Sequence, residues 1–236
     1  MLFEYSPRFP ASLGVRAVLK PLERGDARDV LRDHLPGISF HPANLVDLVR
    51  HRARCQGDDV AFTYLVDGEN EQVCLTNAEL DRRARAIAAR LQLMRLAGER
   101  ALLMYPAGLD FIAAFFGCLY AGVVACPIYP PRRNRAAARI RSVADDAGAR
   151  VVLTTQGVLD RVSTLVSASP NLSRLTWLTT CGLPDALEEC WEEPRVNGET
   201  LAFLQYTSGS TGAPKGVMVS VHFSRKDGRI AGERAE

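Results

Sequence analysis

The sequence predicts an α/β fold with a largely parallel sheet and flanking helices. Helix-like and strand-like segments alternate from residue 43 to residue 220. The strand-like runs, such as "ALLM" at 101–104 and "RVVLTT" at 150–155, are short and continuously apolar, which is typical of strands covered on both faces. At 236 residues, 47% of them hydrophobic, the chain is long and apolar enough to bury a core.

The regular part of the chain is preceded by a leader and opens with a hairpin. Residues 1–42 are rich in Pro, Gly, Arg and Asp, and we expect them to be loosely ordered. Asn44 is a good cap for a first helix. The runs "VAFTYLV" (60–66) and "QVCL" (72–75) predict a small β-hairpin apart from the main sheet, with Gly68 in its turn.

A capped helix follows the hairpin. "TNAE" at 76–79 is a capping box, in which Thr76 and Glu79 satisfy each other's backbone donors. The helix after it carries an apolar stripe made by Leu80, Ala84, Ile87, Ala88 and Leu91. The alternation then continues with strands and helices through a helix near 156–167, the strand-like "LTWLTT" and an acidic connection at 188–200.

One long apolar stretch, residues 111–131, raises the question of a membrane span. Pro127, Pro130 and Pro131 leave about sixteen apolar residues, short of the roughly twenty that a spanning helix needs. We therefore expect a buried helix running into a buried strand, with 111–126 among the most buried residues. Glu4 and two early prolines do not fit a signal peptide, so a cytoplasmic protein is expected.

Composition argues against several other classes of protein. The net charge of +2, with scattered arginines, gives no reason to expect a nucleic-acid partner. Three of the four histidines, at 34, 41 and 51, are irregularly spaced and do not predict a metal site. No two of the six cysteines have the two-residue gap of a zinc or redox motif, and most of them lie in apolar runs. This pattern favours buried free thiols in a reducing cytosol over disulfides. The cysteines are Cys55, Cys74, Cys118, Cys126, Cys181 and Cys190.

A loop rich in Ser, Thr and Gly follows the strand-like "LAFLQY" (201–206) and is the main candidate site. Glycines let backbone N–H groups face a common concavity, and hydroxyls add donors, which suits the oxygens of a polyphosphate. Lys215 adds a positive charge, and Pro214 stiffens the exit. Because "VMVS" (217–220) reads as a strand, we expect a hairpin tip and not the helix-opening loop of ATPases. Turns of this composition also commonly bind nothing.

The order of residues in this loop narrows the interpretation. "YTSGSTGAPKGV" (206–217) resembles the phosphate-loop signature of the adenylate-forming enzymes, the superfamily of acyl-CoA synthetases, adenylation domains and luciferases. Segments 75–91 and 98–132, the latter ending in "YPPR", are similar to the fatty-acyl-AMP ligase branch in particular. The resemblance covers residues 43–220, which we interpret as a partial AMP-binding domain.

The resemblance implies that a fatty acid is activated by ATP as an acyl-adenylate, with release of pyrophosphate. Lys215 would neutralise phosphate charge as the catalytic residue, and Mg²⁺ would bridge the phosphates. The acyl group would pass to an acyl carrier protein or a polyketide synthase, for lipid or polyketide assembly. The resemblance assigns the wrapping of the phosphates to Thr207, Ser208, Gly209, Ser210, Thr211, Gly212 and Lys215.

The resemblance ends abruptly at residue 220. Val221 stands where the family has a His, and residues 221–236 read as a divergent charged tail, which a frameshift, an artificial end or a natural tail would explain. The family's adenine, ribose and magnesium segments and its C-terminal domain do not follow. We expect this N-terminal part alone to release little pyrophosphate and to expose apolar surface. A catalytically inactive remnant with weak polyphosphate binding, and a fatty-acyl-CoA ligase, remain as alternatives.

Overall fold

The computed structural model describes residues 42–131, 137–194, 200–207 and 215–220, and the interpretations of the leader and the charged tail lie outside them. Its main feature is a six-stranded sheet in the order β6-β5-β3-β4-β7-β8. All neighbouring strands are parallel except β7 and β8, which are antiparallel, so the predicted fold class is confirmed. The strands are β3 (Arg100–Met104), β4 (Val124–Ile128), β5 (Val151–Thr154), β6 (Thr176–Thr179), β7 (Leu201–Thr207) and β8 (Lys215–Ser220).

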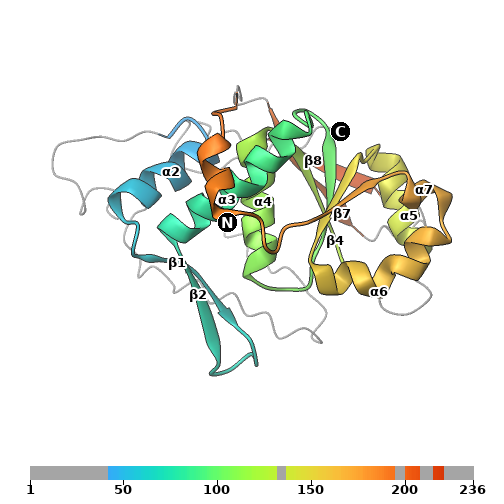
Figure 1. The fold of residues 1–236 in the computed structure, drawn as a ribbon, viewed down its shortest axis with the longest axis horizontal. Coiled ribbons are helices and arrows are strands. Elements are labelled where there is room, and N and C mark those ends of the chain that lie inside the picture. The colour runs from blue at the N-terminus through green and yellow to red at the C-terminus, as the bar shows by residue number, and fades with distance from the viewer. Residues whose placement is uncertain (1–41, 132–136, 195–199, 208–214, 221–236) are drawn as a thin grey trace, which may run out of the picture.

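Helices cover both faces of this sheet (Figure 1). Alternate strand residues divide between the faces: Leu103 and Leu153 pack on one side, Leu102 and Val152 on the other, and all four are fully buried. This burial on both sides explains the continuously apolar strand runs. The first face carries α2 (Leu45–Cys55), α3 (Asn77–Leu93) and α4 (Leu109–Ala121), and the second carries α5 (Ala137–Ala147), α6 (Gln156–Ser167) and α7 (Pro170–Ser173).

The small hairpin is separate from the main sheet, as predicted. Strands β1 (Val60–Leu65) and β2 (Gln72–Thr76) form an antiparallel two-stranded sheet of their own. Its turn is closed by Asp67, whose carboxylate accepts hydrogen bonds from the backbone N–H groups of the three residues from Glu69 to Glu71. These N–H groups, above all that of Glu69, lower the pKa of Asp67.

The capping box and the apolar stripe of α3 are both confirmed. Thr76 N–H donates to the Glu79 carboxylate at 2.9 Å, and Glu79 N–H donates to Thr76 Oγ1 at 3.2 Å. All five predicted stripe residues are buried in the apolar core on the first face, where α3 packs on α4. Asn44 likewise caps α2, by accepting a 3.0 Å hydrogen bond from Asp47 N–H.

The long apolar stretch forms α4 and then β4, which confirms the buried helix and strand. Residues 113–114, 116–121 and 123–126 are buried, whereas Phe111, Ile112 and Phe115 are half-buried at the helix surface. Gly122 ends α4 in the left-handed conformation, with φ of 67°. Among the described residues, no helix has the length and apolarity to cross a membrane.

The connection from β6 to β7 is more structured than its acidic sequence indicates. It contains the 3₁₀ helix η1 (Asp185–Cys190), followed by Trp191, whose indole N–H donates to the Tyr120 carbonyl at 2.8 Å. Glu192 exchanges two hydrogen bonds with the Gln92 amide, and Glu193 pairs with Arg50 at 2.9 Å. These contacts fasten the crossover to α2, α3 and α4 before the chain enters β7.

The prediction for the cysteines was only partly right. All six are free, but only Cys118 and Cys126 are buried, and the other four are exposed. Cys74 belongs to the separate hairpin, and Cys55, Cys181 and Cys190 lie at or beyond the ends of elements, where an apolar neighbour in sequence does not imply burial. Burial raises the pKa of Cys118, and it raises the pKa of Cys126 to about 12.

Candidate functional site

The candidate loop connects the antiparallel strands β7 and β8. Strand β7 lies parallel to β4, with Phe203 beside Ala125. Strand β8 pairs with β7 up to the Thr207–Lys215 position, where the described part of the hairpin ends. The expected pair of strands on either side of the loop is therefore confirmed, whereas residues 208–214 lie outside the described residues.

This hairpin end lies at the carboxyl edge of the parallel sheet. Because β3, β4, β5, β6 and β7 run in the same direction, their last residues lie along one edge. In open α/β sheets, ligands bind outside the carboxyl ends of the strands. The sequence motif is thus attached to the edge at which this fold class binds its ligands. The last residues of the five strands are Met104, Ile128, Thr154, Thr179 and Thr207.

Polar groups join the ends of β3, β5 and β6 at the same edge. Thr154 Oγ1 donates to the Met104 carbonyl at 2.6 Å, and the Tyr105 and Thr180 hydroxyls lie 2.8 Å apart. Burial raises the pKa of Tyr105, so its hydroxyl stays protonated. Tyr129, from the "YPPR" segment, follows β4 at this edge and is 66% exposed. Sequence reasoning did not assign any of these side chains to the site.

Tyr206 attaches the β7–β8 hairpin to helix α5, which covers the second face of the sheet. It lies opposite Gly216 in the strand register and is 8% exposed. A Cβ added to Gly216 would lie 3.0 Å from the Tyr206 ring, so this glycine leaves room for the ring. The Tyr206 hydroxyl donates a 2.6 Å hydrogen bond to Asp146 on α5. Burial, with the Asp146 carboxylate, raises the pKa of Tyr206.

The structure places the predicted phosphate-binding residues only in part. Thr207 and Lys215 are brought opposite each other by the strand register. Ser208, Gly209, Ser210, Thr211 and Gly212 lie outside the described residues. Within the described ranges, no group of three or more His, Cys, Asp or Glu residues is placed to hold a metal ion. The assignment of phosphate contacts therefore stays a prediction.

A hollow of about 460 Å³ borders the turn that follows β3. One wall is the β1–β2 hairpin, including Tyr64 and Val73, and the other is the turn at 106–110. At its rim, Arg83 and Asp110 form a 3.5 Å ion pair between two largely exposed side chains. This hollow therefore lies next to the carboxyl end of β3, on the side of the small hairpin.

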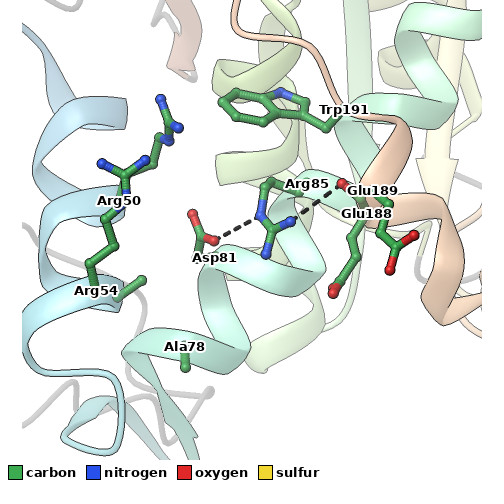
Figure 2. A pocket seen from close by; sticks show the side chains of 9 residues that line it. Arg50, Arg54, Ala78, Asp81, Arg85, Glu188, Glu189 and Trp191 are labelled. Atoms are coloured by element: carbon green, nitrogen blue, oxygen red, sulfur yellow. Dashed lines mark hydrogen bonds and ion pairs between the residues drawn. The ribbon is translucent and has the colours of Figure 1, made fainter.

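A hollow of about 540 Å³ lies between α2, α3 and the crossover segment (Figure 2). Arg85 crosses it, donating to Asp81 at 2.8 Å and to the Glu188 carbonyl at 3.4 Å. Arg50 lies over the Trp191 ring, 4.7 Å from its centroid. Because these side chains join three elements and none belongs to β7 or β8, we interpret this hollow as a structural junction.

Comparison with protein families identifies the domain. The family model described as AMP-binding enzyme matches residues 49–224, most of the chain. The chain belongs to the AMP-binding enzyme family. The match includes the β7–β8 hairpin, its connection and all the strands of the parallel sheet. The resemblance that the loop motif indicated is therefore confirmed, and the match extends over residues 49–224.

Individual members of the AMP-binding family are similar to this chain. A medium-chain fatty-acid–acyl-carrier-protein ligase of Moorena producens is 45% identical over 182 residues, which is 75% of this chain and 31% of that protein. A putative fatty-acid–CoA ligase of Mycobacterium tuberculosis is 36% identical over 185 residues, with the same shares. A crystal structure of a fatty acyl-adenylate ligase from L. pneumophila, in complex with acyl adenylate and pyrophosphate, superimposes with a TM-score of 0.68 at 34% identity, covering 77% of this chain and 31% of that one.

The chain thus spans about a third of the length of the relatives it matches. This third includes the loop motif and the parallel sheet at whose carboxyl edge the motif begins.

Proposed function

We propose that this chain supplies the polyphosphate-binding hairpin of an ATP-dependent fatty-acyl-AMP ligase. The observation that carries the proposal is the position of the motif, whose ends at Thr207 and Lys215 face each other at the carboxyl edge of the parallel sheet. Membership of the AMP-binding family supports it, as does the similarity to a fatty acyl-adenylate ligase. Residues 43–220 form the AMP-binding region, with the leader and the charged tail on either side.

The chemistry assigned to the hairpin is stabilisation of the leaving pyrophosphate. When a carboxylate attacks the α-phosphate of ATP, negative charge grows on the β- and γ-phosphates, and positioned donors and cations lower that barrier. Lys215 supplies the positive charge of this set. The hydroxyl and backbone donors come from Thr207, Ser208, Gly209, Ser210, Thr211 and Gly212.

ATP and Mg²⁺ are the cofactors implied for this family. The position of the two strand ends fits the phosphates of ATP, because ligands of this fold class bind outside the carboxyl edge of the sheet, where β7 ends and β8 begins. Magnesium finds no cluster of acidic or histidine ligands among the described residues. Membership of the family implies Mg²⁺ bound to the phosphate oxygens, where it would neutralise charge.

The proposed substrate is a fatty acid and the proposed acceptor an acyl carrier protein or polyketide synthase. We propose a carrier protein as acceptor because the relative with 45% identity is named as a ligase of fatty acids to acyl carrier protein. Coenzyme A is the second candidate acceptor, because a relative with 36% identity is named as a putative fatty-acid–CoA ligase.

A chimera tests the proposal. Residues 43–220 of this chain would replace the matching region of the Moorena relative, and acyl-adenylate would be measured by mass spectrometry after incubation with ATP, Mg²⁺ and a medium-chain fatty acid. We expect acyl-adenylate formation in the chimera and its loss on Lys215→Ala. A folded chimera that forms no more adenylate than its Lys215→Ala variant would contradict the proposal.

A further inference from the structure

Tyr206 is the last buried side chain described on β7 before the predicted phosphate loop. We propose that Tyr206 is a positioning residue for polyphosphate binding, acting through the strand ends that precede and follow the loop. The inference rests on the proposed function of that loop. Tyr206 would not touch the phosphates itself, because its hydroxyl is turned to α5 and bonded to Asp146.

Three contacts fix Tyr206. Its ring packs among the apolar residues on the second face of the sheet, its hydroxyl donates to Asp146, and the ring lies against Gly216 of the opposite strand. Asp146 is on a helix that is itself fixed, since the neighbouring Asp145 accepts a 2.9 Å hydrogen bond from Asn171 on α7. The end of the hairpin is thereby attached to the helical layer of the second face.

This attachment lies one register position before the loop begins. Tyr206 pairs with Gly216, and the next pair is Thr207 with Lys215. Holding the first pair against α5 fixes the direction in which the second pair leaves the sheet. Donors that are held in place before a ligand arrives bind it more tightly, because less ordering is needed on binding.

A second tyrosine separates positioning from simple stabilisation. The Tyr120 hydroxyl donates a 2.8 Å hydrogen bond to the Asp81 carboxylate, a pair of the same chemistry on the first face of the sheet. Tyr120→Phe therefore removes a comparable hydrogen bond, between α4 and α3 on the face of the sheet opposite to Asp146. A purely structural role for Tyr206 predicts that the two variants behave alike.

Calorimetric titration with inorganic pyrophosphate compares Tyr206→Phe, Tyr120→Phe and the unaltered chain. We expect Tyr206→Phe to weaken binding about three- to tenfold, the factor that one lost hydrogen bond represents, and Tyr120→Phe to leave affinity unchanged. Asp146→Ala should match Tyr206→Phe, whereas Asp146→Asn, which keeps an acceptor oxygen, should lose less. Equal affinities of Tyr206→Phe and Tyr120→Phe, with Lys215→Ala still weakening binding, would overturn the inference and leave the proposed function intact.

Hydrogen exchange gives a second readout that needs no ligand. Tyr206→Phe should speed amide exchange at residues 204–207 and 215–218, and Tyr120→Phe should not. Unchanged exchange at these strand ends would overturn the inference. If the unaltered chain failed to bind pyrophosphate, the proposed function would be contradicted, and so would the expected effect of Tyr206 on affinity. The hydrogen-exchange result would then decide whether Tyr206 anchors the strand ends.

Discussion

Gly117 on α4 lies so close to Ile87 on α3 that a Cβ added to the glycine would be 2.6 Å from Ile87 Cγ2. Both residues are buried where α3 and α4 pack together on the first face of the sheet. The absence of a side chain at Gly117 therefore allows the close approach of the two helices. Because α4 leads into β4 and β4 supports β7, this contact is part of the scaffold of the candidate site.

We expect Gly117→Ala to destabilise the protein by about 1–3 kcal/mol, the usual effect of overpacking a core. The measurement is urea unfolding. Gly157→Ala is the matched control, because no atom lies within 4 Å of a Cβ added there on helix α6. That control should be neutral or gain up to about 1 kcal/mol from helix propensity. Equal stability of the two variants would contradict the close packing of α3 on α4.

Trp191 should be the main attachment of the crossover between β6 and β7. Trp191→Ala removes the hydrogen bond to the Tyr120 carbonyl, the ring contact with Tyr120 and the contact with Arg50, and should cost about 2–3 kcal/mol. Trp191→Phe keeps a ring but loses the donor, so about 1 kcal/mol is expected. Thermal unfolding measures both. A Trp191→Ala variant as stable as the unaltered chain would show that the crossover is held elsewhere.

Alkaline pH should destabilise the fold. Burial raises the pKa values of Tyr105, Tyr120, Cys118 and Cys126, so the folded protein keeps protons that the unfolded chain releases near pH 9–10. These four groups contribute their full stability below about pH 9. As the pH rises toward their pKa values in the folded protein, the free energy of unfolding falls by up to about 1.4 kcal/mol per group for each pH unit. Urea unfolding between pH 7.5 and 10.5 tests this.

The control for the alkaline loss is a tyrosine at the surface. Tyr105→Phe should reduce the dependence of stability on pH, and Tyr129→Phe, at a site that is 66% exposed, is the matched substitution at the surface. A free energy of unfolding that stayed constant up to pH 10.5 would contradict the burial of these hydroxyl and thiol groups.

Strand β8 exposes two large apolar side chains at one end of the described sheet. Val217 is 39% exposed and Met218 is 48% exposed. Exposed apolar residues on an edge strand favour association between chains. We expect sedimentation to show association between chains that grows with protein concentration. Met218→Lys should reduce this association, and Met218→Leu should not. A monomer at all concentrations would contradict the expected uncovered apolar surface.

Features that depend on local periodicity could be predicted from the sequence. The capping box at Thr76, the stripe of α3 and the parallel strands all follow from the spacing of neighbouring residues, and all are confirmed. The two strands of the β7–β8 hairpin were predicted for the same reason. Membership of the AMP-binding family followed from the order of residues in the loop motif.

Features that depend on contacts between distant residues could not be predicted. Tyr206 belongs to the loop motif, but its partner Asp146 lies 60 positions away in an ordinary helix. Trp191 stands in an acidic connection whose composition indicates solvent exposure, although its indole N–H reaches the carbonyl of Tyr120. The exposed thiol of Cys74 shows the same limit, because an apolar strand run does not reveal which of its side chains face solvent.

Titration of the chain with pyrophosphate or ATP, followed by calorimetry or phosphorus NMR, tests the central claim most directly. We expect a dissociation constant in the millimolar range, near −4 kcal/mol, that weakens with added salt because exposed charges are screened within about 8 Å at physiological ionic strength. Lys215→Ala should weaken binding further, and Lys20→Ala in the leader should not. If Lys215→Ala left polyphosphate affinity unchanged, the β7–β8 hairpin would not be the phosphate site that we propose.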